Sequence, residues 1–267
     1  MSQFWSMSSA AVRGLGHRKV GVPCQDKVLT FSSKGVYTIV LADGAGSARF
    51  SHYGAQAVAS AMAQAVIRDF QHLVDMSDEG VQGWARGIIS FTLEQAAKKQ
   101  KCRITDLSST LLLVAVKRRR YLALHIGDGV IGCFEHRALK VLSAPENGEF
   151  SNQTWFTTTL TNPDILRVYR GNTDAMSGFI LMSDGVEPSL YDTCAKQLSD
   201  AAINLIFENQ RIPSGKMCEL LERSMEEAVI PRTNDDCSIA LLSRSRTKNS
   251  SEFESYLRRV AKRDKQA

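Results

Sequence analysis

The chain has 267 residues, of which 43% are hydrophobic and 23% are charged, as in an ordinary globular protein with a large core. Its formal net charge is +5, and the segment after Ser243, with eight Lys or Arg and three Asp or Glu, accounts for the whole excess. The remainder is neutral, which argues against a nucleic-acid-binding core. The six cysteines are scattered without a C-x-x-C pair, which excludes the usual zinc-cluster and redox motifs.

The N-terminal segment and the apolar runs bear on location. The segment MSQFWSMSSAAVRG lacks a basic region followed by an apolar one, so we expect no signal peptide. The longest apolar run, LLLVAV at 111–116, is far too short to cross a bilayer. Together with the scattered cysteines, these features predict a cytoplasmic protein without a membrane span.

The first hundred residues predict two strands followed by two helices. The strands lie within 26–42 and are joined by Lys34-Gly35, a hairpin signal. Apolar residues at helical spacing predict a helix over 51–74 and a second, amphipathic helix over 81–100. The side chains expected near one side of the second helix are Trp84, Ile88, Phe91 and Leu93.

The second half begins with short apolar runs over 109–143, which predict an antiparallel meander. Residues 145–163 are polar and rich in turn formers, and we expect a functional loop or flap there that carries Trp155 and Phe156. The remaining expected elements are a strand at 178–184, helices at about 190–208 and 215–229, and a last strand at 237–243.

The order of these elements indicates an α+β fold, in which two antiparallel β-sheets form a sandwich flanked by helix pairs. We assign residues 1–243 to one folded domain and residues 244–267 to a basic polar tail. An amphipathic pattern within the tail is compatible with a short helix.

Acidic residues recur at the ends of the apolar runs. A single Asp-Gly pair is common hairpin-turn chemistry, but several carboxylates at strand ends predict an oxygen-lined pocket for divalent cations. The first pair leads through a Gly-rich turn into a helix start, which favours an anion such as phosphate. No Gly-Lys-Ser/Thr follows, which excludes a nucleotide P-loop. The acidic sites are Asp43-Gly44, Asp128-Gly129, Asp184-Gly185 and Asp235-Asp236.

A set of short motifs extends this pattern along the chain. In order they are Arg13…His17…Gln25-Asp26, Ala42-Asp43-Gly44-x-Gly46, Ser109-Thr110, Gly127-Asp128, Ser183-Asp184-Gly185 and Asp235-Asp236-x-Ser238. From about residue 8 to 243 the chain therefore resembles the metal-dependent, type 2C-like Ser/Thr protein phosphatases, and most of all their compact bacterial branch. The resemblance implies hydrolysis of phosphoserine and phosphothreonine by a hydroxide that bridges two Mn²⁺ or Mg²⁺ ions.

The resemblance also implies a set of metal ligands. Asp43 would bridge the two ions, and Asp184 and Asp235 would complete one site. The Gly44 carbonyl would serve the other site, with Asp26 contributing directly or through water. Carboxylate, carbonyl and water ligands suit Mn²⁺ and Mg²⁺.

Three further residues are candidates at the site. By the same resemblance, Asp128 lies where some bacterial members bind a third ion, and Arg13 would hold the substrate phosphate. His17 is either a surface residue or a catalytic group that contacts phosphate or donates a proton, since imidazole titrates near neutral pH. The general acid is left open between a metal-bound water, His17 and His52.

The chain departs from the family pattern at three positions. Gln25 stands where many members carry Glu, which removes one negative charge from the second metal site. Ala45 stands where eukaryotic members place a His thought to protonate the leaving group, and bacterial members commonly lack that His as well. Asp236 stands where Asn is usual, which adds charge beside Asp235.

The resemblance implies phosphorylated proteins as partners, modified by a cognate Ser/Thr kinase, and an enzyme that acts as a monomer. We expect no nucleic-acid partner. Two alternatives remain: a phosphatase-like binding or regulatory module with weak catalysis, which Gln25 favours, and a metal-dependent hydrolase of small phosphate esters.

Overall fold

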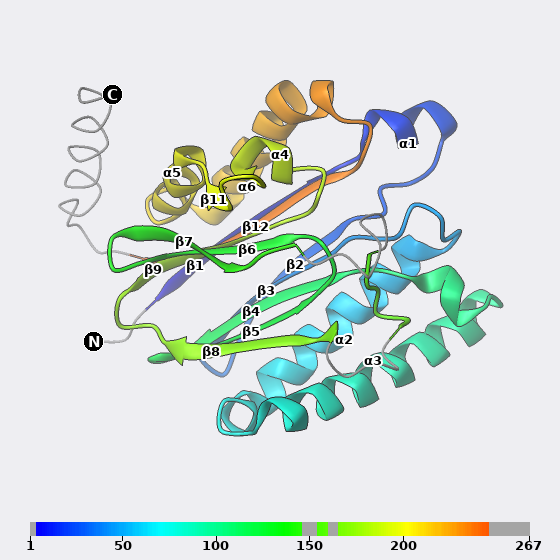
Figure 1. Ribbon diagram of the computed structural model, residues 1–267, viewed down its shortest axis with the longest axis horizontal. Helices are drawn as coiled ribbons and strands as arrows, with labels where there is room; N and C mark the ends of the chain where they lie inside the picture. Colours follow the sequence, from blue (N-terminus) through cyan, green and yellow to red (C-terminus); the bar gives the residue numbers. More distant parts are fainter. Residues whose placement is uncertain (1–3, 146–153, 160–164, 246–267) are drawn as a thin grey trace.

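The computed structural model describes residues 4–145, 154–159 and 165–245. Two five-stranded antiparallel sheets pack face to face, with α2 (Ser51–Leu73) and α3 (Asp78–Gln100) covering one of them. Helices α5 (Asp200–Asn209) and α6 (Ser214–Ser224) cover the other sheet, so the molecule has four layers (Figure 1). The predicted α+β sandwich with flanking helix pairs is confirmed.

The two sheets take strands from both halves of the chain, and every strand pair is antiparallel in the described residues. The first sheet has the order β1 (Trp5–Val12), β12 (Cys237–Arg244), β9 (Met176–Met182), β6 (Val130–Glu135) and β7 (Ala138–Ser143). The second has the order β2 (Lys27–Ser33), β3 (Val36–Ala42), β4 (Leu111–Lys117), β5 (Arg120–Ile126) and β8 (Arg167–Asn172).

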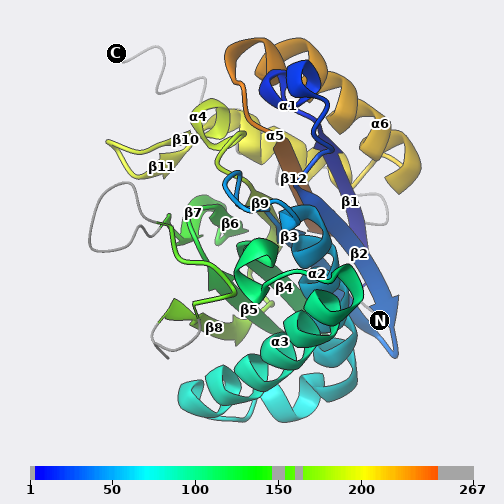
Figure 2. The ribbon, with the colours of Figure 1, turned by 90° about the vertical axis from the view of Figure 1, so that its right-hand side faces the viewer.

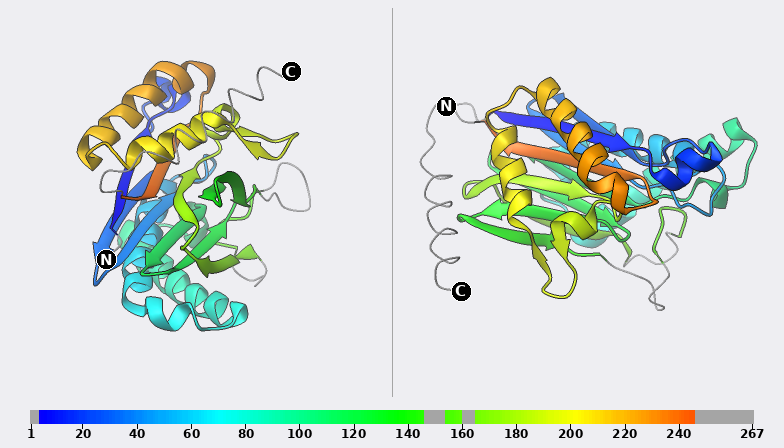
Figure 3. Two further views of the ribbon diagram at one scale, coloured as in Figure 1. Left: turned by 90° about the vertical axis from the view of Figure 1, so that its left-hand side faces the viewer. Right: turned by 90° about the horizontal axis from the view of Figure 1, so that it is seen from above.

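Shorter elements connect these layers. Seen from above, α5 and α6 lie across the first sheet (Figure 3). The remaining elements are α1 (Leu15–Val20), a 3₁₀ helix (Ile104–Leu107), α4 (Glu187–Leu190), a small hairpin of β10 (Tyr191–Asp192) and β11 (Gln197–Leu198), α5 (Asp200–Asn209), α6 (Ser214–Ser224), a π-helical turn (Met225–Val229) and a second 3₁₀ helix (Ile230–Arg232).

Three apolar clusters hold the layers together, one between the sheets and one under each helix pair. Strand β4 shows why its sequence is apolar throughout. Leu111 and Leu113 belong to the cluster under α2 and α3, whereas Leu112 and Val114 belong to the cluster between the sheets. A strand that is covered on both faces has no position where a polar side chain would reach water.

The predicted meander over 109–143 is wrong in its pairing, although its four strands are present. The chain crosses from one sheet to the other after β5, at residues 127–129. Strand β6 pairs with β7 and β9 rather than with β5. Apolar runs alone do not show which sheet a strand joins, because both sheets bury one face against the same central cluster.

Two helix predictions also need correction. The buried side of α3 carries Val81, Ala85 and Ile89, while Phe91 is 63% exposed. Of the predicted side chains, Leu93 is buried and Trp84 and Ile88 pack against the same cluster under α2 and α3, so the prediction fails at Phe91. The helix expected at 190–208 begins only at Asp200, because β10 and β11 occupy residues 191–198.

Among the other elements, some predictions are confirmed and some strands were not predicted. The hairpin within 26–42 and the helix over 51–74 are confirmed. Strands β1 and β8 were not predicted, because small or polar residues interrupt their apolar pattern. Trp155 packs against the cluster under α2 and α3. Most of the expected flap, and the tail from residue 246 onward, lie outside the described residues.

Candidate metal centre

The ends of several strands meet at one end of the sandwich, which Figure 2 shows facing the viewer. Lys27 pairs with Ala42, so the residues just beyond this pair, Asp26 and Asp43, are neighbours. In the other sheet, Met182 at the end of β9 pairs with Ile239 of β12, next to the loop that carries the last acidic pair. Register alone therefore brings acidic residues from both sheets to one place.

Asp26, Asp43 and Asp184 form the centre of this acidic cluster. The carboxyl of Asp43 lies beside both of the others, close enough for a shared proton to bond them. Asp26 is only 2% exposed, and neither of its carboxylate oxygens has a hydrogen-bond partner in the described residues. One buried oxygen of Asp184 is also without a partner in that part of the chain.

Burial is the main cause of the unusual proton affinities in this cluster. It raises the pKa of Asp26 to about 7 and that of Asp184 to about 6; a hydrogen bond with Asp43 offsets part of each rise, and the charges of other nearby carboxylates add to it. Burial, together with the charges of Asp26 and Asp184, also raises the pKa of Asp43 well above its usual value. Negative charge in this place is stabilised either by protons or by cations.

These carboxylates fit hard divalent cations, since unpartnered buried oxygens are the ligands that such ions take. Across the described ranges, no three or more His, Cys, Asp or Glu side chains converge tightly enough to form a complete ion site. Mg²⁺ typically keeps several waters and takes only one or two carboxylates, so partial enclosure suits it.

Asp128 and Asp235 lie at the edge of the cluster, near enough for their charges to act on Asp184. Asp128 lies in the crossover between β5 and β6, where Thr154 donates a hydrogen bond to it at 2.5 Å. Asp235 is exposed, and its Oδ1 accepts the backbone N–H of Asp236 at 2.8 Å.

Glu187 is an acidic residue of the cluster that the sequence analysis missed. It lies in α4, three residues after Asp184, and burial raises its pKa to about 7, with the charges of Asp184 and Asp128 adding to the shift. The turn at residues 184–186 returns the chain, so that Glu187 comes back to the cluster at the first residue of α4.

The backbone around Asp43 is held by close packing. Thr110 accepts the Asp43 N–H on its hydroxyl at 2.9 Å, and its own N–H donates to the Asp43 carbonyl at 2.8 Å. Ser109 forms an isolated antiparallel bridge with Gly44, so Ser109 and Thr110 together hold the backbone of the Asp43 turn. Gly44 has no room for a side chain, because a Cβ there would press on Ser51 and Gln25.

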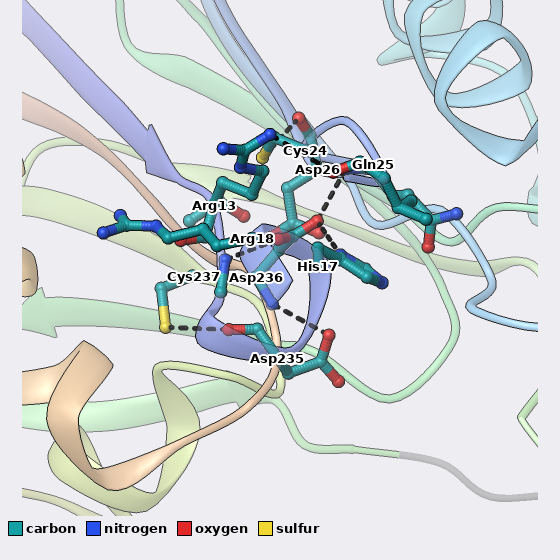
Figure 4. Close-up of polar contacts among 12 residues, drawn as sticks. Arg13, His17, Arg18, Cys24, Gln25, Asp26, Asp235, Asp236 and Cys237 are labelled. Carbon is teal, nitrogen blue, oxygen red and sulfur yellow. Dashed lines mark hydrogen bonds and ion pairs between the residues drawn. The ribbon is translucent and has the colours of Figure 1, made fainter. Parts of the chain in front are cut away.

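Asp236 has a role that differs from the one its sequence position suggested. Its carboxylate accepts the backbone N–H of Gly14 at 2.7 Å and that of Gln25 at 2.6 Å (Figure 4). His17 Nδ1 lies 2.9 Å from the same carboxylate. Two backbone donors and the nearby His17 ring therefore face the added charge, and Asp236 ties the segments after β1 and before β2 to the start of β12.

The two proposed phosphate contacts, Arg13 and His17, lie on this side of the cluster (Figure 4). His17 belongs to α1, and its side chain is 19% exposed. Arg13 is exposed, and its Nη1 lies 3.5 Å from the Val22 carbonyl. His52 packs its ring against Tyr53 at 4.2 Å between centroids, in keeping with a structural role.

Known proteins now place the chain in a family. The protein phosphatase 2C family matches residues 13–226, and the chain belongs to this family. The membership inferred from the motifs is thus confirmed. A comparison with curated protein sequences gave no match.

Several solved structures share the fold. A bacterial serine phosphatase superposes with a TM-score of 0.64 at 14% identity, over 92% of this chain and 100% of the other. PppA, a regulatory component of T6SS in Pseudomonas aeruginosa, gives 0.62 at 15% identity, over 90% and 98%. Serine/threonine phosphatase Stp1 from Staphylococcus aureus gives 0.62 at 13% identity, over 91% and 96%. At such identities the likeness concerns the fold alone.

No helix among the described residues is both long and apolar enough to cross a membrane.

Proposed function

We propose that this chain is a metal-dependent phosphoprotein phosphatase that hydrolyses phosphoserine and phosphothreonine. One observation carries the proposal. Asp26 is buried with two unpartnered carboxylate oxygens beside Asp43 and Asp184, at the strand ends of a protein phosphatase 2C fold. Such a cluster is costly to bury unless cations bind there.

The cluster supports the ligand set that the family resemblance implies for two Mn²⁺ or Mg²⁺ ions. Asp43, the central carboxylate, would contact both ions, Asp184 and Asp235 one of them, and Asp26 with the Gly44 carbonyl the other. When bound, two such cations would lower the pKa of a nearby water and neutralise charge on the phosphoryl oxygens. A third ion beside Asp128 is part of the same proposal. Glu187 lies near enough to Asp128 for the two carboxyl groups to interact electrostatically.

His17 and Arg13 are proposed to handle the substrate phosphate. His17 Nδ1 lies 2.9 Å from the Asp236 carboxylate, which leaves its second ring nitrogen for another contact. That nitrogen donates when the ring is protonated, which suits either a phosphate oxygen or the leaving group. Arg13, just before α1, provides a planar guanidinium.

The test is hydrolysis of a phosphothreonine peptide by EDTA-stripped protein, with and without added Mn²⁺. Hydrolysis should require the metal and should be lost in Asp43→Asn. Activity that persists in EDTA, or that survives in Asp43→Asn, contradicts the proposal.

A catalytically weak binding module is the second candidate, and Gln25 favours it. The Gln25 side chain is 4% exposed, its Oε1 has no partner in the described residues, and it replaces a charge at the second ion. A titration that finds at most one weak Mn²⁺ site, together with negligible turnover, would select this candidate. The third candidate, a small phosphate-ester hydrolase, requires higher kcat/KM on sugar phosphates than on phosphopeptides.

The remaining parts of the proposal concern context. Residues 1–243 would form the catalytic domain, with the basic segment 244–267 as an accessory tail. The substrates would be proteins modified by a cognate Ser/Thr kinase, and the chain would act as a monomer in the bacterial cytoplasm. Names such as serine phosphatase and serine/threonine phosphatase among the structural neighbours support this context.

A further inference from the structure

A pocket of about 550 Å³ lies between the start of α2 and the end of α3, apart from the acidic cluster. Figure 1 shows these two helix ends at the same end of the sandwich as α1. The residues that line the pocket are Ser47, Arg49, Phe50, Lys101, Cys102, Arg103 and Asp106.

The pocket is positively charged, since it holds three cationic side chains and one carboxylate. Asp106 is already engaged, because it accepts hydrogen bonds from Arg103 Nη2 at 2.9 Å and from the Arg103 backbone N–H at 3.0 Å. Arg49 lies over the Phe50 ring at 5.2 Å, and neither it nor Lys101 forms an ion pair within the described ranges. Two cations therefore remain available to an anionic ligand.

Backbone bonds fix this pocket to the loop that carries Asp43. The Phe50 N–H donates to the Asp106 carbonyl at 2.9 Å, and the Ala45 N–H donates to the Ser108 carbonyl at 3.0 Å. Ser47, at the rim, is four residues from Asp43, so their Cα atoms are at most about 15 Å apart. An extended peptide covers that distance in roughly four or five residues.

We infer that this pocket is a docking subsite for an anionic side chain of the substrate, about three to five residues from the phosphorylated residue. The inference rests on the proposed phosphatase function. The acidic cluster repels acidic segments of a substrate, whereas Arg49 and Lys101 attract them. The ligand chemistry is a carboxylate of Asp or Glu, or a second phosphate, and both suit an Arg beside a Lys.

The experiment uses three phosphothreonine peptides that differ only in the flanking residues: neutral, Glu-containing, or with a second phosphothreonine. The full chain is compared with Arg49→Glu and with the double variant Arg49→Glu/Lys101→Gln. Arg118→Glu is the matched control, because it makes the same charge change in the β4–β5 turn, at the far end of β4 from Thr110. Arg49 is exposed and precedes α2, where an acidic residue is tolerated by the helix dipole.

Two readouts are measured: kcat/KM with Mn²⁺, and Kd from fluorescence anisotropy of labelled peptides in EDTA. We expect wild type to favour an anionic flank over the neutral one by about 5-fold in both, and Arg49→Glu to remove most of this preference. Arg118→Glu should keep it. The two anionic peptides show which anion the pocket selects.

Equal Kd values for all three peptides, or equal effects of Arg49→Glu and Arg118→Glu, would overturn the inference. Because the anisotropy arm needs no turnover, it decides the matter even if the chain hydrolyses no phosphopeptide. In that case the absence of hydrolysis contradicts the proposed function, and the ratio of Kd values for anionic and neutral peptides separately decides whether the docking subsite exists.

Discussion

Two buried aspartates at the same end of the sandwich, Asp236 and Asp26, differ in the hydrogen bonds that their carboxylates accept. Asp236 is 1% exposed. Its carboxylate accepts hydrogen bonds from the N–H groups of Gly14 and Gln25, and His17 Nδ1 lies 2.9 Å away. Asp26 is 2% exposed, and both of its oxygens lack a partner in the described residues. The Asp236 carboxylate is stabilised by backbone hydrogen bonds, whereas the Asp26 carboxyl needs a proton or a cation for its stabilisation.

The difference separates residues that hold the site from residues that act in it. Close packing serves the first purpose, as at Gly185, where a Cβ would overlap the Asp236 carbonyl. Raised pKa values mark the second, since burial and like charges act on Asp26, Asp43 and Asp184 together. Substitutions at the two kinds of position should therefore change different observables.

Asp43→Asn should produce the largest effect. It removes the central carboxylate, so Mn²⁺-dependent hydrolysis should fall by roughly 10³-fold, as measured by kcat/KM on a phosphothreonine peptide. Its melting temperature in EDTA should rise, because the substitution removes a buried charge that its neighbours disfavour. A lower Tm in EDTA would show that the carboxylate is structural instead.

Asp236→Asn should show the reverse pattern. An amide offers an N–H₂ group where the carboxylate accepts from two backbone N–H groups, which leaves one of these buried donors unpaired. We expect a loss of about 2 kcal/mol in the free energy of unfolding, or roughly 5 °C in Tm. An unchanged Tm with a full loss of activity would place Asp236 among the acting residues.

The pH dependence of stability should also differ with and without metal. In EDTA, folded Asp26 and Asp184 hold protons up to about pH 7 and 6, while the unfolded chain loses them near pH 4. The folded state thus binds more protons in this window, so stability is highest at its acidic side and falls as pH rises toward 8. The expected fall is on the order of 1–3 kcal/mol.

Thermal melts between pH 5.5 and 8 measure this slope. Saturating Mn²⁺ should flatten or invert it, because the cation replaces the protons. Asp26→Asn, which lacks one of the titrating groups, should have a shallower slope in EDTA. A slope that neither Mn²⁺ nor Asp26→Asn alters would assign the effect to groups outside the cluster.

Gln25→Glu should have the smallest effect. Gln25 packs beside Gly44, and a carboxylate there restores the charge that many family members carry. We expect the weaker Mn²⁺ site to bind roughly 3- to 10-fold more tightly, as measured by calorimetric titration, with a lower Tm in EDTA. Weaker Mn²⁺ binding would instead mean that the amide itself supports the site.

Much of the fold followed from local patterns. The hairpin ending at Ala42 and the helix that starts at Ser51 were predicted because turn chemistry and helical periodicity are local properties. The crossing at residues 127–129 was not, because an apolar strand fits either face of the central cluster. The hairpin at 191–198 was missed because two-residue strands leave no periodic signal.

The features of the site were likewise predicted only in part. The gathering of Asp43 and Asp184 was foreseen from acidic residues at strand ends, which register brings together. The compensated state of Asp236 was not foreseen, because its donors at Gly14 and Gln25 are more than two hundred residues away in the chain. Glu187 was overlooked because its helix has only four residues.

Calorimetric titration of Mn²⁺ into the EDTA-stripped chain tests the central claim most directly. The unpartnered oxygens of Asp26 and the shared carboxyl of Asp43 predict saturable binding of about two ions, which Asp43→Asn abolishes and Asp236→Asn largely retains. No saturable binding in the wild type, or equal binding by wild type and Asp43→Asn, would contradict the assignment of this cluster as a metal centre.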